Sequence, residues 1–181
     1  MIRNVFNRSI KHFILLATAV FFLSAQKVDP REDTNAKIKA VYLYNFSKYV
    51  EWPEEYKNGS FVVTVIGNNP YLLAELEKMS QKKVGTQPIS IKSISSVSSI
   101  EKSNIIFVPF ESSGELTEII NKMKGRSTLV VTEKPGLAKQ GAAINFIIKE
   151  NKQLFELNKS NAERYKLKIS SSLIPLAILV D

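Results

Sequence analysis

The chain contains no cysteine, so it has neither a disulfide framework nor a thiolate that could act as a nucleophile or a metal ligand. Histidine is nearly absent too, since His12 in the first segment is the one example. These two shortages exclude a Ser–His–Asp triad, a Cys–His pair and the usual zinc ligands from the rest of the chain. Glycine-rich phosphate-binding motifs are also missing. We therefore expect a protein that is not an enzyme, with no catalytic residue, no metal and no cofactor.

The first 25 residues have the composition of a secretory signal peptide. Arg3, Arg8 and Lys11 come first without any acid, an apolar run follows over residues 13–23, and the small residues Ser24 and Ala25 close the segment. The alternative is a single membrane anchor, but a spanning helix needs about 20 apolar residues. The order of these three regions predicts residues 1–25 as a cleaved signal and a periplasmic location.

The charge of the chain is mildly basic. Removing residues 1–25 takes away three basic residues and lowers the net charge from +8 to +5. A mildly basic surface favours anionic lipids or acidic partners. Because the Lys and Arg residues are scattered along the chain rather than clustered, we expect no nucleic-acid partner.

The mature chain predicts one domain whose strands alternate with helices. A polar tether over residues 26–35 leads to a domain over residues 36–181, with Thr34 or Asn35 as the cap of the first helix. Apolar runs predict strands, and apolar residues at spacings of three and four predict helices. The predicted strands are 61–67, 88–94, 104–110, 127–133 and a hairpin over 141–158, and the predicted helices are 36–52, 71–81, 114–124, 161–168 and 171–180.

This alternation is typical of a mostly parallel sheet with helices on both faces. The hairpin near the C-terminus must be antiparallel, because a short turn joins its two strands. The expected fold is therefore α/β, a three-layer sandwich with a mostly parallel sheet and a C-terminal antiparallel hairpin.

Two aromatic residues near the end of the first helix are candidates for binding a protein partner. Tyr44 falls off the main apolar face of the predicted helix, and Trp52 lies in the turn before Pro53. Tyrosine and tryptophan are common anchors of interfaces, although a core or packing role is the favoured alternative for both side chains.

Polar residues follow the carboxyl ends of several predicted strands, where open α/β sheets bind ligands. They are candidate ligand-binding residues, with roles as helix caps or turn formers as the alternative. Asn68 and Asn69 follow the first predicted strand, Ser112 and Ser113 follow the third, and Glu133 and Lys134 follow the fourth.

The hairpin carries polar residues inside otherwise apolar strands. Asn145 interrupts the first strand, Glu156 interrupts the second, and Asn158 stands where it can cap the next helix. We expect Asn145 to bond a neighbouring loop or the final helix and Glu156 to pair with a lysine or with free N–H groups. These residues are predicted to be structural, because leaving a buried amide unpaired costs about 1–3 kcal/mol.

Several motifs together resemble the YfiR-like family of exported bacterial proteins. They are KAVYLYNFSKYVEWP at 39–53, VIGNNP at 65–70, NIIFVP at 104–109 and LVVTEKPGLAKQGAAINF at 129–146, followed by FELNKSNAERYKLKISSSLIPLA at 155–177. The paired motifs GAAINF and LFELN are specific at this spacing. The structural signature of the resemblance is carried by Gly141, Asn145, Phe146, Phe155, Glu156 and Asn158.

The resemblance implies a non-enzymatic periplasmic regulator. The best-known family member binds the periplasmic part of an inner-membrane diguanylate cyclase and holds it inactive, and its release raises cyclic di-GMP and favours biofilm formation. The expected partner is thus a membrane sensor or such a cyclase, and a homodimer is a further expectation. Disulfide-based control does not carry over, because this chain has no cysteine. The alternative is a periplasmic solute-binding module for a small anionic or aromatic ligand.

Overall fold

The computed structural model describes the backbone of residues 30–181 and the side chains from residue 34 onward. The predicted signal peptide and the first residues of the predicted tether lie outside this described part. The α-helices are α2 (Pro30–Tyr49), α3 (Pro70–Ser80), α4 (Leu116–Lys122) and α5 (Lys159–Arg164). Short 3-10 helices cover Glu54–Tyr56, Val97–Ser99, Phe110–Glu115, Leu137–Gln140 and Ile174–Leu176.

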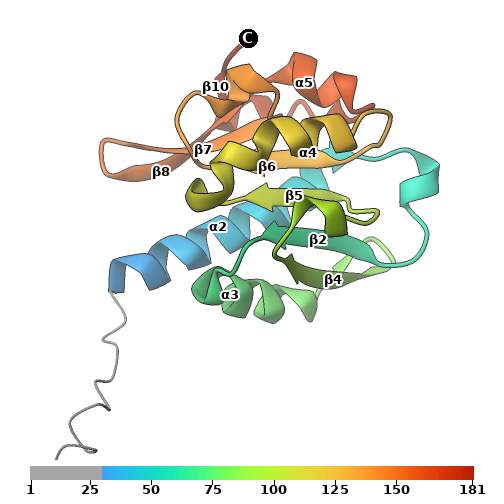
Figure 1. The fold of residues 1–181 in the computed structure, drawn as a ribbon, viewed down its shortest axis with the longest axis horizontal. Coiled ribbons are helices and arrows are strands. Elements are labelled where there is room, and N and C mark those ends of the chain that lie inside the picture. The colour runs from blue at the N-terminus through green and yellow to red at the C-terminus, as the bar shows by residue number, and fades with distance from the viewer. Residues whose placement is uncertain (1–29) are drawn as a thin grey trace, which may run out of the picture. The chain divides into compact units, whose positions relative to one another are not determined.

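The strands form one large sheet and one small pair (Figure 1). They are β1 (Val50–Glu51), β2 (Phe61–Ile66), β3 (Lys83–Val84), β4 (Gln87–Ile94), β5 (Ile105–Val108), β6 (Leu129–Thr132), β7 (Ile144–Lys149), β8 (Lys152–Leu157), β9 (Lys168–Ile169) and β10 (Ile178–Leu179). The large sheet has eight strands in the order β10-β8-β7-β6-β5-β2-β4-β3, while β1 and β9 pair with each other.

The centre of the large sheet is parallel. β4, β2, β5, β6 and β7 run parallel to one another, whereas β8 turns back antiparallel to β7. β3 is antiparallel to β4 at one edge, and β10 runs parallel to β8 at the other. This arrangement confirms the predicted α/β fold with a mostly parallel sheet and an antiparallel hairpin.

Helices cover both faces of the sheet, as strands with continuous apolar sequence require. Every residue of β5 and β6 is buried. In Figure 1, α4 lies on the near side of the strands, and its residues Leu116 and Ile119 are buried. α2 and α3 lie on the opposite side, where they share contacts with β2 and β4. The predicted three layers are thus helix, sheet and helix.

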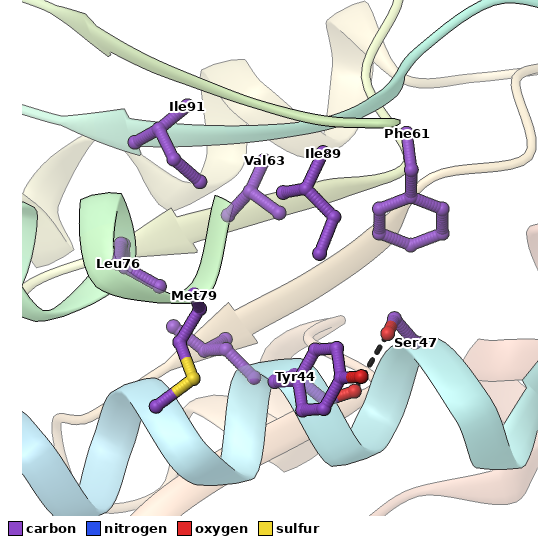
Figure 2. Close-up of a pocket in the computed structure, with 9 residues that line it drawn as sticks. Tyr44, Ser47, Phe61, Val63, Leu76, Met79, Ile89 and Ile91 are labelled. Atoms are coloured by element: carbon purple, nitrogen blue, oxygen red, sulfur yellow. Dashed lines mark hydrogen bonds between the residues drawn. The ribbon is translucent and has the colours of Figure 1, made fainter. Parts of the chain in front are cut away.

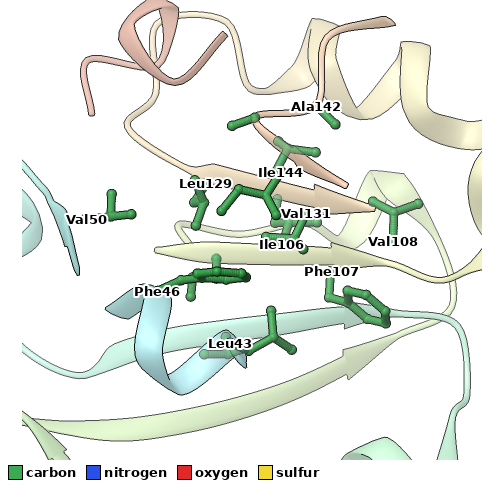
Figure 3. Close-up of a cluster of buried hydrophobic side chains, with 14 of the residues drawn as sticks. Leu43, Phe46, Val50, Ile106, Phe107, Val108, Leu129, Val131, Ala142 and Ile144 are labelled. Carbon is green, nitrogen blue, oxygen red and sulfur yellow. The ribbon is translucent and has the colours of Figure 1, made fainter. Parts of the chain in front are cut away.

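The layer between α2 and the sheet holds an aromatic cluster. Phe46 of α2 lies 5.9 Å from Phe146 of β7 and 5.1 Å from Phe155 of β8, measured between ring centroids. Tyr42 and Phe107 complete the cluster. Figure 3 shows Phe46 reaching toward the strands among Leu43, Ile106 and Leu129. Such aromatic pairs contribute about 0.5–1.5 kcal/mol each beyond the area they bury, so this cluster fixes α2 on the hairpin.

The first helix starts earlier than predicted. α2 begins at Pro30, so the prediction that Thr34 or Asn35 caps it is wrong, and residues 30–35 are helical rather than part of a tether. Proline is well suited to the first helical position, because the N–H it lacks would have no partner there.

The last segment is not the predicted helix. Residues 174–176 make a single 3-10 turn that contains Pro175, and β10 then joins the sheet beside β8. The Val180 N–H donates to the Leu157 carbonyl at 3.1 Å, which extends the pairing. A strand forms here because β-branched residues near the end of the chain can pair with an open edge of the sheet. Across the described residues, no helix combines the length and hydropathy needed to cross a membrane.

Candidate functional site

A cleft of about 480 Å³ opens at the carboxyl ends of β5 and β6, beside the first half of α2. In an α/β sheet this is the edge where ligands bind. Its lining residues come from α2, from the loops after both strands and from the hairpin, and they are Asn35, Lys39, Phe110, Glu133, Pro135, Phe146, Ile147, Ile148 and Gln153. The topology thus brings together residues that are more than a hundred positions apart in the sequence.

Glu133 is the polar centre of this cleft. It follows β6 directly, and its side chain is only 11% exposed. Its carboxylate forms an ion pair with the Lys39 ammonium group of α2 and accepts a hydrogen bond from the Phe110 N–H at 3.0 Å. One side chain therefore ties α2 to the loops after β5 and β6. The pair also offers a ligand one group of each charge, since either partner could exchange its contact for a charged group of a ligand.

Two large apolar side chains stand exposed on the lining of the cleft. Phe110 is 53% exposed and Ile148 is 66% exposed. The Lys134 ammonium group lies 5.7 Å from the Phe110 ring centroid, which is within cation–π range. Exposed apolar residues gathered beside a concave surface are typical of a site that binds another molecule.

Of the candidate ligand-binding residues, Glu133 lines this cleft, whereas Asn68, Asn69, Ser112 and Ser113 do not. The Asn69 side chain is engaged as the cap of α3, because its Oδ1 accepts from the Leu72 N–H at 3.0 Å. Ser112 lies beside Gly67, where a Cβ atom would come within 3.3 Å of the Ser112 Oγ. The turn containing Asn68 therefore does meet the loop of Ser112 and Ser113, but the ligand role of these residues stays a prediction.

Part of the role assigned to the two serines is wrong. Ser112 and Ser113 lie inside a 3-10 helix over Phe110–Glu115, and α4 begins only at Leu116, so neither serine caps α4. The sequence did contain the signal for the cleft, because Glu133 follows the carboxyl end of a buried strand. Lys39 carried no such signal, since its approach depends on how α2 crosses the sheet.

Trp52 is buried, which agrees with the core alternative for this residue and not with an exposed anchor. Its side chain is 5% exposed and stands edge-on to the Phe61 ring, with 5.0 Å between the ring centroids. Trp52 directly follows β1, which pairs with β9 outside the large sheet. Its Nε1–H finds no acceptor among the described residues. A direct contact between Trp52 and a partner is therefore incompatible with this conformation.

Tyr44 is partly exposed, in agreement with its position off the main apolar face. Figure 2 shows its ring between α2 and α3, close to Met79 and beneath the strands that carry Val63 and Ile89. The ammonium groups of Lys48 and Lys82 lie 4.3 Å and 4.8 Å from the ring centroid. The partner role of Tyr44 stays a prediction, now with two lysines beside it.

The hairpin signature forms a buried polar row across three strands. Asn145 is fully buried, and it faces Thr132 of β6 and Glu156 of β8 in register. The Thr132 hydroxyl donates to the Asn145 Oδ1 at 2.7 Å, and the Asn145 Nδ2 donates to the Glu156 carboxylate at 2.9 Å. The partners of Asn145 thus lie on neighbouring strands, and the prediction of a loop or the final helix is wrong. Glu156 accepts from an amide N–H and not from a lysine. Phe146 and Phe155 lie on the opposite side of the hairpin, in the aromatic cluster.

Polar groups also fix the turn that enters β7. As predicted, Asn158 caps the next helix, since its Oδ1 accepts from the Asn161 N–H at 2.9 Å. The Asn161 Nδ2 donates to two carbonyls of this turn, and the Tyr165 hydroxyl donates to the Gly141 carbonyl at 3.1 Å. Burial raises the pKa of Tyr165 to about 12. The signature residues therefore hold the hairpin, the turn and α5 together.

Among the residues that the structure describes, no three His, Cys, Asp or Glu side chains gather closely enough to hold a metal ion. The candidate site is consequently described by its ion pair, its amides and its apolar lining.

Comparisons with known proteins agree with this architecture. Residues 36–178 match the family described as YfiR/HmsC-like. A solved structure of a conserved domain protein from Vibrio cholerae superimposes with a TM-score of 0.56 at 14% identity, over 78% of this chain and 60% of that chain. The chain thus spans less than two thirds of that relative, whose likeness concerns the fold alone. No curated protein matches the chain. With the family match covering most of its length, the chain belongs to the YfiR/HmsC-like family.

Proposed function

We propose that this protein is a periplasmic regulator that binds the periplasmic part of an inner-membrane signalling protein and modulates its output without catalysing a reaction. A diguanylate cyclase is the partner favoured by the family, and cyclic di-GMP and biofilm formation would be the readouts downstream. Family membership over residues 36–178 supports the regulatory role. The export signal predicted in residues 1–25 supports the location.

The observation that carries the binding role is the exposed apolar pair Phe110 and Ile148 on the lining of the cleft. Burying an exposed aromatic or branched side chain contributes about 1.5–3 kcal/mol, so covering both provides a large share of the affinity of a regulatory complex. The neighbouring ion pair between Lys39 and Glu133 supplies the polar groups that orient a partner.

The test compares two double variants in binding to the purified periplasmic domain of a candidate membrane sensor from the native host. Phe110→Ala with Ile148→Ala should weaken binding at least about 30-fold. The matched control is Leu176→Ala with Leu179→Ala, which removes apolar side chains of similar exposure outside the cleft. Equal affinity of both variants and the wild type would contradict the assignment of this surface. Unchanged cyclic di-GMP after gene deletion would contradict the regulatory role in cyclase signalling.

A second candidate function is the capture of a small anionic or aromatic solute in the same cleft. It is favoured by the volume of about 480 Å³, which lies in the range of small-molecule sites, and by the charged pair within it. Thermal-shift screening of small carboxylates and aromatic compounds tests it. A ligand of this kind should raise the melting temperature of the wild type but not that of Glu133→Gln, and no shift with any compound would reject it.

A further inference from the structure

The outer side of α2 carries a line of basic and apolar residues. Lys37, Val41, Tyr44 and Lys48 follow one another at spacings of four, three and four, which places them along one side of the helix. Lys37 and Lys48 are exposed, Val41 is 39% exposed and Tyr44 is partly exposed. From residue 34 to residue 49 the helix contains no acidic residue, and Lys37 and Lys48 are its lysines outside the ion pair of Lys39 with Glu133. This side of α2 is therefore positively charged and partly apolar.

Two of the lysines on this surface converge on Tyr44 from different elements. Lys48 belongs to α2, while Lys82 follows α3, and both ammonium groups lie over the Tyr44 ring, so at most about 9 Å separates them. No carboxylate of the described part of the chain forms an ion pair with either lysine. Because two like charges repel at this distance, an anion placed between them would stabilise the arrangement.

The same surface continues into a shallow groove beside β1 and β9. The groove has a volume of about 500 Å³, and Lys48 and Lys168 contribute the positive charges of its lining, with Glu51 as its one acid. Tyr49 lines it as well and is 36% exposed. Lysines interleaved with partly exposed tyrosines are typical of surfaces that lie at the boundary between water and lipid.

We propose that this surface, defined by Lys37, Val41, Tyr44, Lys48, Lys82 and Lys168, docks on the anionic phospholipid headgroups of a membrane. The charge complementarity comes from the unpaired lysines, whose side chains can each reach a phosphate group. The exposed Val41 and Tyr49 side chains would be buried among the headgroups, which distinguishes a lipid surface from an acidic protein segment. The inference extends the proposed function by placing the regulator on the membrane that holds its partner, and it does not depend on it.

The test uses the protein recovered after export, with its N-terminus checked by mass spectrometry, in co-flotation with lipid vesicles. One set of vesicles contains phosphatidylcholine alone, and the other contains phosphatidylcholine mixed with phosphatidylglycerol. The wild type should bind the mixed vesicles, lose binding as salt rises, and ignore the neutral ones. Lys48→Gln with Lys82→Gln should lower binding about 30-fold, because each lysine near an anionic surface contributes about 1 kcal/mol.

The matched control is Lys124→Gln with Lys139→Gln, which removes the same charge from exposed positions after α4 and before Gly141. It should bind the mixed vesicles nearly as well as the wild type, with the same melting temperature as the first variant. Equal losses in both variants would overturn the proposal, since net charge alone would then explain binding. It would also be overturned if the first variant kept its vesicle binding and instead lost its affinity for the sensor's periplasmic domain.

Discussion

The two sides of the β7–β8 hairpin are built on different physical principles. On the side of α2, Phe146 and Phe155 pack against the rings of Phe46 and Tyr42. On the other side, Asn145 is held by hydrogen bonds within the sheet. Adjacent residues of one strand thus belong to an apolar cluster and to a polar row. The comparison teaches that the apolar side supplies most of the stability, whereas the polar side favours one register of the strands.

The largest effect is expected on the apolar side. Phe46→Ala should lower the free energy of unfolding by about 3–5 kcal/mol, because Phe46 is fully buried and the change leaves a cavity between α2 and the hairpin. Urea denaturation measures the loss. Phe46→Leu serves as the control and should recover most of it. A loss under about 1 kcal/mol would show that α2 is not fixed by this cluster.

A smaller loss is expected from the polar row. Asn145→Leu should destabilise the fold by about 1–3 kcal/mol, because the Thr132 hydroxyl and the Glu156 carboxylate both lose their buried partner. Thermal unfolding of this variant beside the wild type measures it. The double variant with Thr132→Val should lose less than the sum of the two single changes, since the two residues share one hydrogen bond. A melting temperature at or above that of the wild type would refute the structural role of Asn145.

The smallest effect is expected behind the hairpin, at Tyr165. Its hydroxyl donates to the Gly141 carbonyl, and Tyr165→Phe should cost about 1 kcal/mol near pH 7. Because burial raises the pKa of Tyr165 to about 12, the folded state keeps its proton while the unfolded state begins to ionise near pH 10. The contribution of Tyr165 is therefore complete below about pH 10 and is lost between about pH 10 and 12.

Unfolding measured from pH 8 to pH 12 tests whether the contribution of Tyr165 to stability falls as the pH rises. The difference in stability between the wild type and Tyr165→Phe should shrink or reverse as the pH rises through that window. A difference that stays constant with pH would mean that the hydroxyl ionises as easily in the folded chain as in the unfolded one.

Sequence reasoning was strongest where a local pattern determines the environment. The continuous apolar runs of β5 and β6 were enough to identify strands, and the position of Asn158 identified a helix cap. Predictions from the sequence were wrong where contacts between distant segments determine the environment of a residue. Trp52 is buried against Phe61 of β2, and the last residues form β10 because β8 offers an open edge. The sequence indicated one half of the ion pair in the cleft, because Glu133 directly follows a strand. It did not indicate Lys39, which approaches Glu133 from a distant helix.

Gly141 limits which substitutions the turn before β7 can accept. Its φ of 118° lies in a region that favours glycine, and an added Cβ atom would stand 2.4 Å from the Ile120 side chain of α4. A larger residue at this position therefore requires that the Ile120 side chain move or be smaller, and in either case the backbone strain remains. The turn before β7 is consequently a point where the history of earlier substitutions decides which later ones the protein tolerates.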